Sequence, residues 1–243
     1  LVALGLDDDE TQTLVITAED SAGLTVGNIT NSSALQSLTT TAAAGAASTI
    51  GTIIDAEALA TLSITTTGSS STYGVGIIGG TTAAALTSLT LQAASGGALT
   101  LAEIDSASSS ALTSVSISST GTNSTVNLDG ATNTMDLGSA TVTTLTIDVD
   151  ANSKLYYEAN SIVSGAITTA NISFGDYSTM EGQATNGDDL TITGAMTTLN
   201  LTLGRGMTYT GGEMIIASGT VTTLNLTTAL GAETVDLDAS NIL

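Results

Sequence analysis

The side chains of this sequence that could do chemistry are acidic, because its 23 Asp and Glu residues stand against two basic residues and no His or Cys. Several acids recur at a nearly fixed distance behind an apolar residue. The distance is 14 residues for Leu89–Glu103, Val115–Asp129, Leu199–Glu213 and Leu224–Asp238, 13 for Leu145–Glu158 and 16 for Ile172–Asp188. If the chain stacks with this period, the carboxylates form a column in which neighbours about 5 Å apart repel by roughly 1 kcal/mol even in water.

A column of like charges needs cations, and further acids stand beside it at alternate positions, which on a strand project to the same side. Oxygen ligands without His or Cys suit Ca²⁺, which takes about six to eight oxygens. We therefore expect structural Ca²⁺ with acidic ligands. The candidate ligands are Glu103, Asp105, Asp129, Asp148, Asp150, Glu158, Asp188, Asp189, Glu213, Asp236 and Asp238. The alternative is a solvated acidic face that only keeps the protein soluble.

The elements that would position these acids are short apolar repeats. The segment Val142-Thr-Thr-Leu-Thr-Ile147 has close copies at 86–91, 112–117, 196–201 and 221–226, and weaker copies at 35–38, 59–64 and 169–174. The central apolar residues of these copies are Leu38, Leu62, Leu89, Val115, Leu145, Ile172, Leu199 and Leu224, at intervals of 24 to 30 residues. A recurring period in this range is typical of a solenoid.

Each period contains two or three short runs in which aliphatic residues alternate with Thr, Ser or Asn, which is the pattern of a half-buried strand. These runs predict an all-β chain folded as a parallel β-helix, a solenoid of eight coils with about 27 residues per coil. In it, Leu89, Val115, Leu145 and Leu199 share an inner row. The absence of proline agrees, because proline cannot donate to a sheet ladder. A β-sandwich is the alternative fold, but it does not explain the repeated hexamer.

The repeats divide the chain into two parts. We expect solenoid repeats over 35–243 and an irregular N-terminal coil or cap over 1–34, where the hexamer is not recognisable. The segment 52–60 is the best helical candidate, because it contains a run of Ala, Glu and Leu, which favour helix.

Charge and composition exclude several classes of function. The formal charge of −21 opposes binding to nucleic acid or to anionic membranes, both of which need Lys and Arg. The sequence contains no apolar run of about 18 residues, the length that a membrane-spanning helix needs. Without His or Cys the chain has no histidine-based triad, no Cys nucleophile and no zinc site, so we expect no enzyme. We expect Lys154 and Arg205 to form local salt bridges, and Arg205 could also contact another subunit.

The sequence resembles a known family. The segments Ala85-Leu-Thr-Ser-Leu-Thr-Leu91 and Val142-Thr-Thr-Leu-Thr-Ile-Asp148, together with Asn186-Gly-Asp-Asp-Leu190, look like those of bacterial surface-layer (S-layer) proteins. The resemblance is to the Thr/Ala/Gly-rich, calcium-binding kind related to repeats-in-toxin (RTX) proteins, which is secreted without a cleaved N-terminal signal. It implies a parallel β-solenoid, an extracellular lattice or filament, and dependence on Ca²⁺. The strict glycine-rich nonapeptide of that family is absent here, and only 186–189 is similar to it.

We therefore expect a structural, self-assembling protein at the bacterial cell surface, stabilised by calcium. Its expected partners are further copies of itself, with cell-surface glycan as another candidate. The first alternative is an adhesin or an ice- or glycan-binding module, because outward Thr-x-Thr pairs such as Thr39–Thr41 and Thr65–Thr67 could match a lattice of water or glycan. The second is a polysaccharide-acting β-helix enzyme that uses paired carboxylates. Low Lys, no Cys and abundant Thr and Ser suit an extracellular location.

Overall fold

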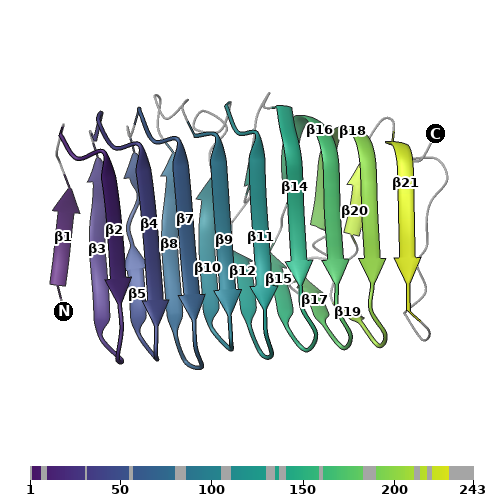
Figure 1. The fold of residues 1–243 in the computed structure, drawn as a ribbon, viewed down its shortest axis with the longest axis horizontal. Coiled ribbons are helices and arrows are strands. Elements are labelled where there is room, and N and C mark those ends of the chain that lie inside the picture. The colour runs from purple at the N-terminus through teal and green to yellow at the C-terminus, as the bar shows by residue number, and fades with distance from the viewer. Residues whose placement is uncertain are drawn as a thin grey trace.

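The chain is a parallel β-solenoid of about seven turns, with about 26 residues per turn (Figure 1). This computed structural model describes residues 2–6, 10–30, 32–54, 57–79, 86–104, 111–129, 135–136, 141–158, 161–182, 190–210, 214–217 and 221–229. Every strand pairing between these residues is parallel and joins segments one turn apart. The predicted all-β solenoid is therefore confirmed, and the alternative β-sandwich, which would be antiparallel, is wrong.

The strands stack in three columns around one apolar interior. The first column contains β2 (Thr13–Ala18), β4 (Ser37–Ala43), β7 (Thr61–Thr67), β9 (Ser88–Ala94), β11 (Ser114–Thr120), β14 (Thr141–Val149), the second halves of β16 (Ser161–Phe174) and β18 (Leu190–Leu203), and β21 (Val221–Thr228). The second contains β1 (Val2–Leu6), β3 (Gly23–Thr30), β5 (Ala47–Ile50), β8 (Thr72–Gly79), β10 (Ala98–Ile104), β12 (Thr125–Asp129), β15 (Lys154–Glu158), β17 (Thr179–Gly182) and β19 (Thr208–Thr210). The third contains β6 (Ile53–Ile54), β13 (Met135–Asp136) and β20 (Met214–Ala217), with the ends of β3, β8 and β10 and the first halves of β16 and β18.

One inward row of the first column matches the row predicted from the repeated hexamer. In chain order it contains Leu14, Leu38, Leu62, Leu89, Val115, Leu145, Ala170, Leu199 and Leu224. The prediction of Ile172 for this row is wrong by two residues, because Ala170 is the partner of both Leu145 and Leu199. Ile172 lies in the next inward row, between Ile147 and Leu201. Alternation along the strand permits either assignment, because Ala170 and Ile172 both face inward and are both buried.

The two consecutive threonines of the hexamer lie near the start of the first-column strand in their turn. Around Val142-Thr143-Thr144-Leu145, the side chains of Val142 and Leu145 are buried, whereas both threonines face outward. Two consecutive outward residues cannot belong to one regular strand, so the chain bends here. At the equivalent corner of earlier turns, the Thr87 hydroxyl donates to the Ala60 carbonyl, and the Thr113 hydroxyl donates to the Thr87 carbonyl. The Thr-Thr pair is thus a corner that links one turn to the turn before it.

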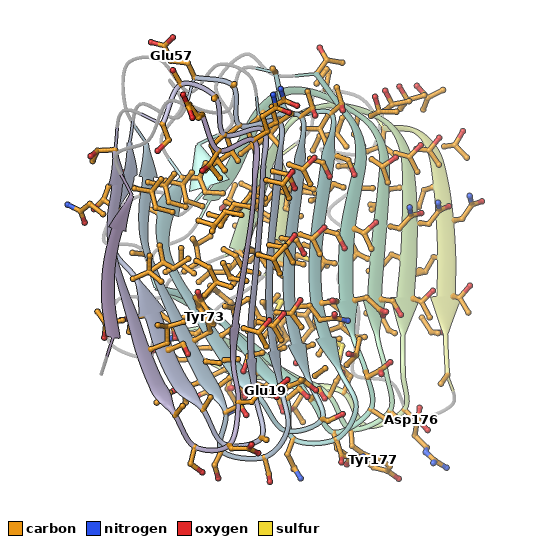
Figure 2. The ribbon with its side chains drawn as sticks, turned by 60° about the vertical axis from the view of Figure 1, so that its left-hand side comes forward. Glu19, Glu57, Tyr73, Asp176 and Tyr177 are labelled. Carbon is orange, nitrogen blue, oxygen red and sulfur yellow. The ribbon has the colours of Figure 1, made fainter. Side chains whose placement is uncertain are left out.

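The interior is a narrow stack of aliphatic side chains. In the third column Ile29, Ile53, Ile78 and Ile104 lie directly above one another and are at most 2% exposed. Branched aliphatic side chains pack well on a pleated surface, and burial of each stabilises the fold by about 1.5–3 kcal/mol. Tyr73 also points into this interior (Figure 2).

Tight turns join the first column to the second. Gly96, in one of them, has a φ of +84°, which glycine adopts without steric cost. The backbone N–H of Gly96 donates a hydrogen bond of 3.0 Å to Oγ of Ser124, a buried serine in the next turn of the solenoid. The backbone N–H of Gly45 donates in the same way to Ser71 Oγ at 2.8 Å. Side chains therefore tie consecutive turns together where the strand ladder is interrupted.

The predicted helix at 52–60 is wrong, because Ile53 and Ile54 form β6, and the described residues of that segment contain no helix. The stacked isoleucines place this segment in the third column in spite of its helix-favouring composition. Within the predicted N-terminal coil or cap, β2 and β3 pair in register with β4 and β5.

Candidate functional site

The predicted acidic column can be followed over part of its length. Asp129 and Glu158 end β12 and β15, and their Cα atoms are partners in adjacent turns. Glu103, on β10, lies out of register with them. Leu101 of β10 is the partner of Leu128 of β12. Glu103 follows Leu101 by two residues, whereas Asp129 follows Leu128 by one. In the preceding turn the partner of Glu103 is Ile77, so the row is not acidic there.

The second acidic pair, Asp148 and Asp150, lies at the end of β14. Both carboxylates are on the outer side, as their spacing predicts, and Asp148 is half-buried while Asp150 is exposed. Burial raises the pKa of the Asp148 carboxyl, and the negative charge of Asp150 raises it further, whereas a hydrogen bond with Ser173 acts in the opposite direction. Asp150 Oδ2 accepts a hydrogen bond of 2.9 Å from the backbone N–H of Gly121. Both carboxylates therefore already form hydrogen bonds that join neighbouring turns.

The remaining candidate ligands have no described position. Asp105, Asp188, Asp189, Glu213, Asp236 and Asp238 lie outside the described residues, and for Asp129 and Glu158 only the backbone is described. Among the residues whose placement is described, no group of three or more acids could hold a metal ion. Since Ca²⁺ needs about six to eight oxygens, the Asp148–Asp150 pair would have to be completed by water or backbone carbonyls.

Both basic residues form salt bridges, as predicted, but each partner lies in an adjacent turn, 27 residues away for Lys154 and 29 for Arg205. Lys154 Nζ contacts Glu181 Oε2. A guanidinium nitrogen of Arg205 is 3.1 Å from Asp176 Oδ2, and the backbone N–H of Arg205 donates to Asp176 Oδ1 at 2.7 Å. The guanidinium also lies over the ring of Tyr177, 5.3 Å from its centroid. Sequence reasoning missed the roles of Asp176 and Tyr177, which form one exposed turn at the lower end of the strands in Figure 2.

The outward side of the first column is a broad polar surface, which we call the front face (Figure 1). Its side chains form three straight rows along the whole column and a shorter fourth row of Ala43, Thr67, Ala94 and Thr120, because each outward residue lies above its partner in the next turn. The three long rows are Thr13, Ser37, Thr61, Ser88, Ser114, Thr144, Thr169, Thr198 and Thr223; Val15, Thr39, Ser63, Thr90, Ser116, Thr146, Asn171, Asn200 and Asn225; and Thr17, Thr41, Thr65, Gln92, Ser118, Asp148, Ser173, Thr202 and Thr227. The predicted outward Thr39, Thr41 and Thr65 are all in these rows.

The front face differs from the rest of the chain in charge. Its rows contain a single charged residue, Asp148, although the chain has a formal charge of −21. Charged residues on the second column include Glu103, Lys154 and Glu181. Other acids lie at the ends of the strands, as Figure 2 shows for Glu57 at the top and Asp176 at the bottom. The strand register thus gathers neutral hydroxyl and amide groups on one side of an acidic molecule.

No helix in the described part of the chain is long and apolar enough to cross a membrane. Comparison of the chain with models of protein families, with curated proteins and with solved structures found no match.

Proposed function

We propose that this chain is a structural, self-assembling subunit of an extracellular bacterial surface lattice or filament, stabilised by calcium. The observation that supports the proposal best is the continuous in-register stack, in which each strand of the first column between β2 and β21 pairs with the strands of the turns before and after it. At about 4.8 Å per strand, nine described strands form a wall about 38 Å long. A wall of this kind suits a load-bearing protein, because every turn is fixed by its neighbours.

The polar exterior supports a surface location. The outward rows consist mainly of Thr, Ser and Asn, and the acids keep the assembled protein soluble and hydrated. The resemblance to S-layer proteins of the RTX-related type points the same way, and copies of the chain are the partners that it implies. A cell-surface glycan is a further candidate partner. The proposal includes no catalytic role, since the chain has neither His nor Cys.

The calcium part of the proposal rests on repulsion between neighbouring acids. Asp129 and Glu158 are partners in adjacent turns, where strands are about 4.8 Å apart. Two carboxylates at this spacing repel unless a cation lies between them or one of them is protonated. Ca²⁺ accepts carboxylate oxygens from more than one segment, so it would hold consecutive turns together at this edge.

Electron microscopy and thermal melting, each with millimolar Ca²⁺ and with a chelator, test this function. We expect ordered filaments or lattices with Ca²⁺, and a lower melting temperature with loss of assemblies in the chelator. Mg²⁺ at the same concentration is the control for ionic strength. Monodisperse monomers in millimolar Ca²⁺ at high protein concentration would refute the proposal. If assembly and melting temperature were unchanged in the chelator, the calcium part of the proposal would be refuted and the self-assembly part would stand.

A second candidate function is a module that binds an ice or glycan lattice. The observation that favours it is that outward hydroxyls, although irregular along the sequence, form straight rows on the front face. Observation of ice crystals growing in the protein solution, and sedimentation with insoluble glycans, would detect such binding. A chain that shapes ice or sediments with a glycan while remaining monomeric would favour this candidate over the structural one.

A further inference from the structure

We propose that the front face is the surface through which two copies of this chain associate side by side. This inference rests on the proposed self-assembly and adds to it the contact surface and its geometry. The same face on both copies would form the contact, related by a two-fold axis, as in most pairs of identical subunits.

Charge favours this face over the outward side of the second column. Two copies with a formal charge of −21 each repel one another, and contact through the acidic second column would bring carboxylates together. Like charges facing one another across an interface cost several kcal/mol. The rows of the front face contain one carboxylate, that of Asp148, and the exposed Asp150 stands beside it at the end of β14, so two copies can approach there with less repulsion than through the second column.

The shape and area of the front face suit a specific contact. In Figure 1 its strands lie side by side at the front, and no described segment crosses them. Nine strands span about 38 Å, and seven residues along each strand span about 20 Å, which gives roughly 800 Å² per copy. This area is the size that a standard stable interface buries on each partner. Short Ser and Thr side chains also let two sheets approach closely, at about 10 Å between their mean planes.

The chemistry of the face suits association without an apolar patch. Side chains in the middle row, such as Thr90, Ser116 and Thr146, are half-buried hydroxyls that both donate and accept hydrogen bonds. A standard interface contains about ten hydrogen bonds, and rows from two copies can supply that number. The mixture of Ser, Thr, Asn, Gln and Val in the rows favours a protein partner over ice, whose surface repeats one spacing.

The test compares two variants, each of which adds one negative charge to a different face. Ser116→Glu places a carboxylate in the middle row of β11, the central strand of the front face. The matched control is Thr100→Glu, which places the same side chain at an outward, half-buried position of β10 in the second column. Analytical ultracentrifugation and electron microscopy measure association, and circular dichroism checks that both variants keep the fold.

We expect the wild-type chain and Thr100→Glu to form lateral pairs with dissociation constants within about threefold of each other. Ser116→Glu is expected to weaken lateral pairing by at least about tenfold, because its carboxylate would be buried against a copy of itself. Equal effects of the two variants would refute the inference, as would single files of wild-type subunits with no lateral pairs. The second result would leave the proposed self-assembly intact. A wild-type chain that stays monomeric would refute both proposals, and if it also shaped ice, the front face would be an ice-binding surface.

Discussion

The side-chain amide nitrogen of Asn200 donates a hydrogen bond of 2.7 Å to Oδ1 of Asn171, although 29 residues separate the two in the sequence. Asn225 extends this arrangement, because its Nδ2 donates to Asn200 Oδ1, also at 2.7 Å. The three residues belong to β16, β18 and β21, so the amides form a ladder parallel to the backbone ladder. Such side-chain ladders stabilise stacked parallel strands.

Replacement of the middle residue of this ladder, Asn200→Ala, is expected to destabilise the protein by about 1–2 kcal/mol. It removes two hydrogen bonds, each of which contributes about 0.5–1.5 kcal/mol net. Urea unfolding measures the free energy of unfolding. Thr146→Ala, in the same row but outside the ladder, is the control and should change that energy by no more than about 0.5 kcal/mol. Equal losses in the two variants would show that the ladder contributes nothing of its own.

The architecture could be predicted from the sequence because large apolar side chains recur once per turn at equivalent positions. Leu89, Val115 and Leu145 are apolar in equivalent places, and their shared row follows from alternation alone. Where the inward residue is small, as at Ala170, the same pattern no longer identifies the register. The error at 52–60 has a different origin, since a short strand gains its stability from the turns above and below it, and local composition does not report on those.

The acidic column could be predicted only in part, because the turns between the first and second columns differ in length. From Ser119 to Val126 the chain advances seven residues, whereas it advances six between the equivalent residues Ala93 and Leu99. A constant distance of 14 residues behind the hexamer therefore places Glu103 and Asp129 in different positions. Fixed spacing in the sequence gives fixed position in the fold only where every intervening turn has the same length.

A second prediction concerns a turn in which backbone segments approach closely. A Cβ atom at Gly204 would lie 2.3 Å from the carbonyl carbon of Gly175 and 2.5 Å from the backbone nitrogen of Asp176. Backbone atoms cannot move aside as the end of a side chain can. We expect Gly204→Ala to destabilise the protein by about 3 kcal/mol, which is a fall in melting temperature of roughly 6–12 °C.

The control for this variant is Gly74→Ala. A Cβ atom at Gly74 would have Thr49 Cγ2 as its nearest neighbour, at 3.5 Å, which is an ordinary contact. Because alanine is also the better strand residue, Gly74→Ala is expected to be neutral or to stabilise by up to about 1 kcal/mol. A melting temperature that falls equally in both variants would contradict the close approach at Gly204.

A third prediction concerns alkaline pH. Burial raises the pKa of the Tyr73 hydroxyl from 10.0 to about 12, and the neighbouring Thr40 hydroxyl opposes this shift. The folded state therefore holds the proton more tightly than the unfolded state. The resulting stability is fully present below about pH 10 and is lost as the pH rises to about 12. For two pH units this loss is about 2–3 kcal/mol.

Tyr73→Phe removes this dependence. We expect the difference in the free energy of unfolding between Tyr73→Phe and the wild type to be constant below pH 10 and to shift in favour of the variant between pH 10 and 12. Urea unfolding at several pH values measures it. The control is the same replacement at a tyrosine that is 53% exposed, Tyr177→Phe. Parallel curves for Tyr73→Phe and the wild type would mean that Tyr73 is accessible to solvent.

The last prediction concerns Asp148, the carboxylate within the front face. Its pKa is raised first by burial and then by the charge of Asp150, so its ionised form destabilises the folded state. Asp148→Asn should therefore raise the melting temperature at pH 7, by about 1–3 °C for an effect on the scale of surface charges. As the pH falls below the usual Asp pKa of 3.8, the wild-type carboxyl becomes neutral in both states and the difference should disappear.

Glu103→Gln is the control, because it removes one negative charge from a half-buried side chain outside the front face. If net charge alone destabilised the protein, both variants would gain equally at pH 7. A gain confined to Asp148→Asn shows that the position of the carboxylate matters. The same pair tests the proposed contact, since two copies paired through the front face bring their Asp148 side chains into the interface. Asp148→Asn should then strengthen lateral association in analytical ultracentrifugation, and Glu103→Gln should leave it unchanged.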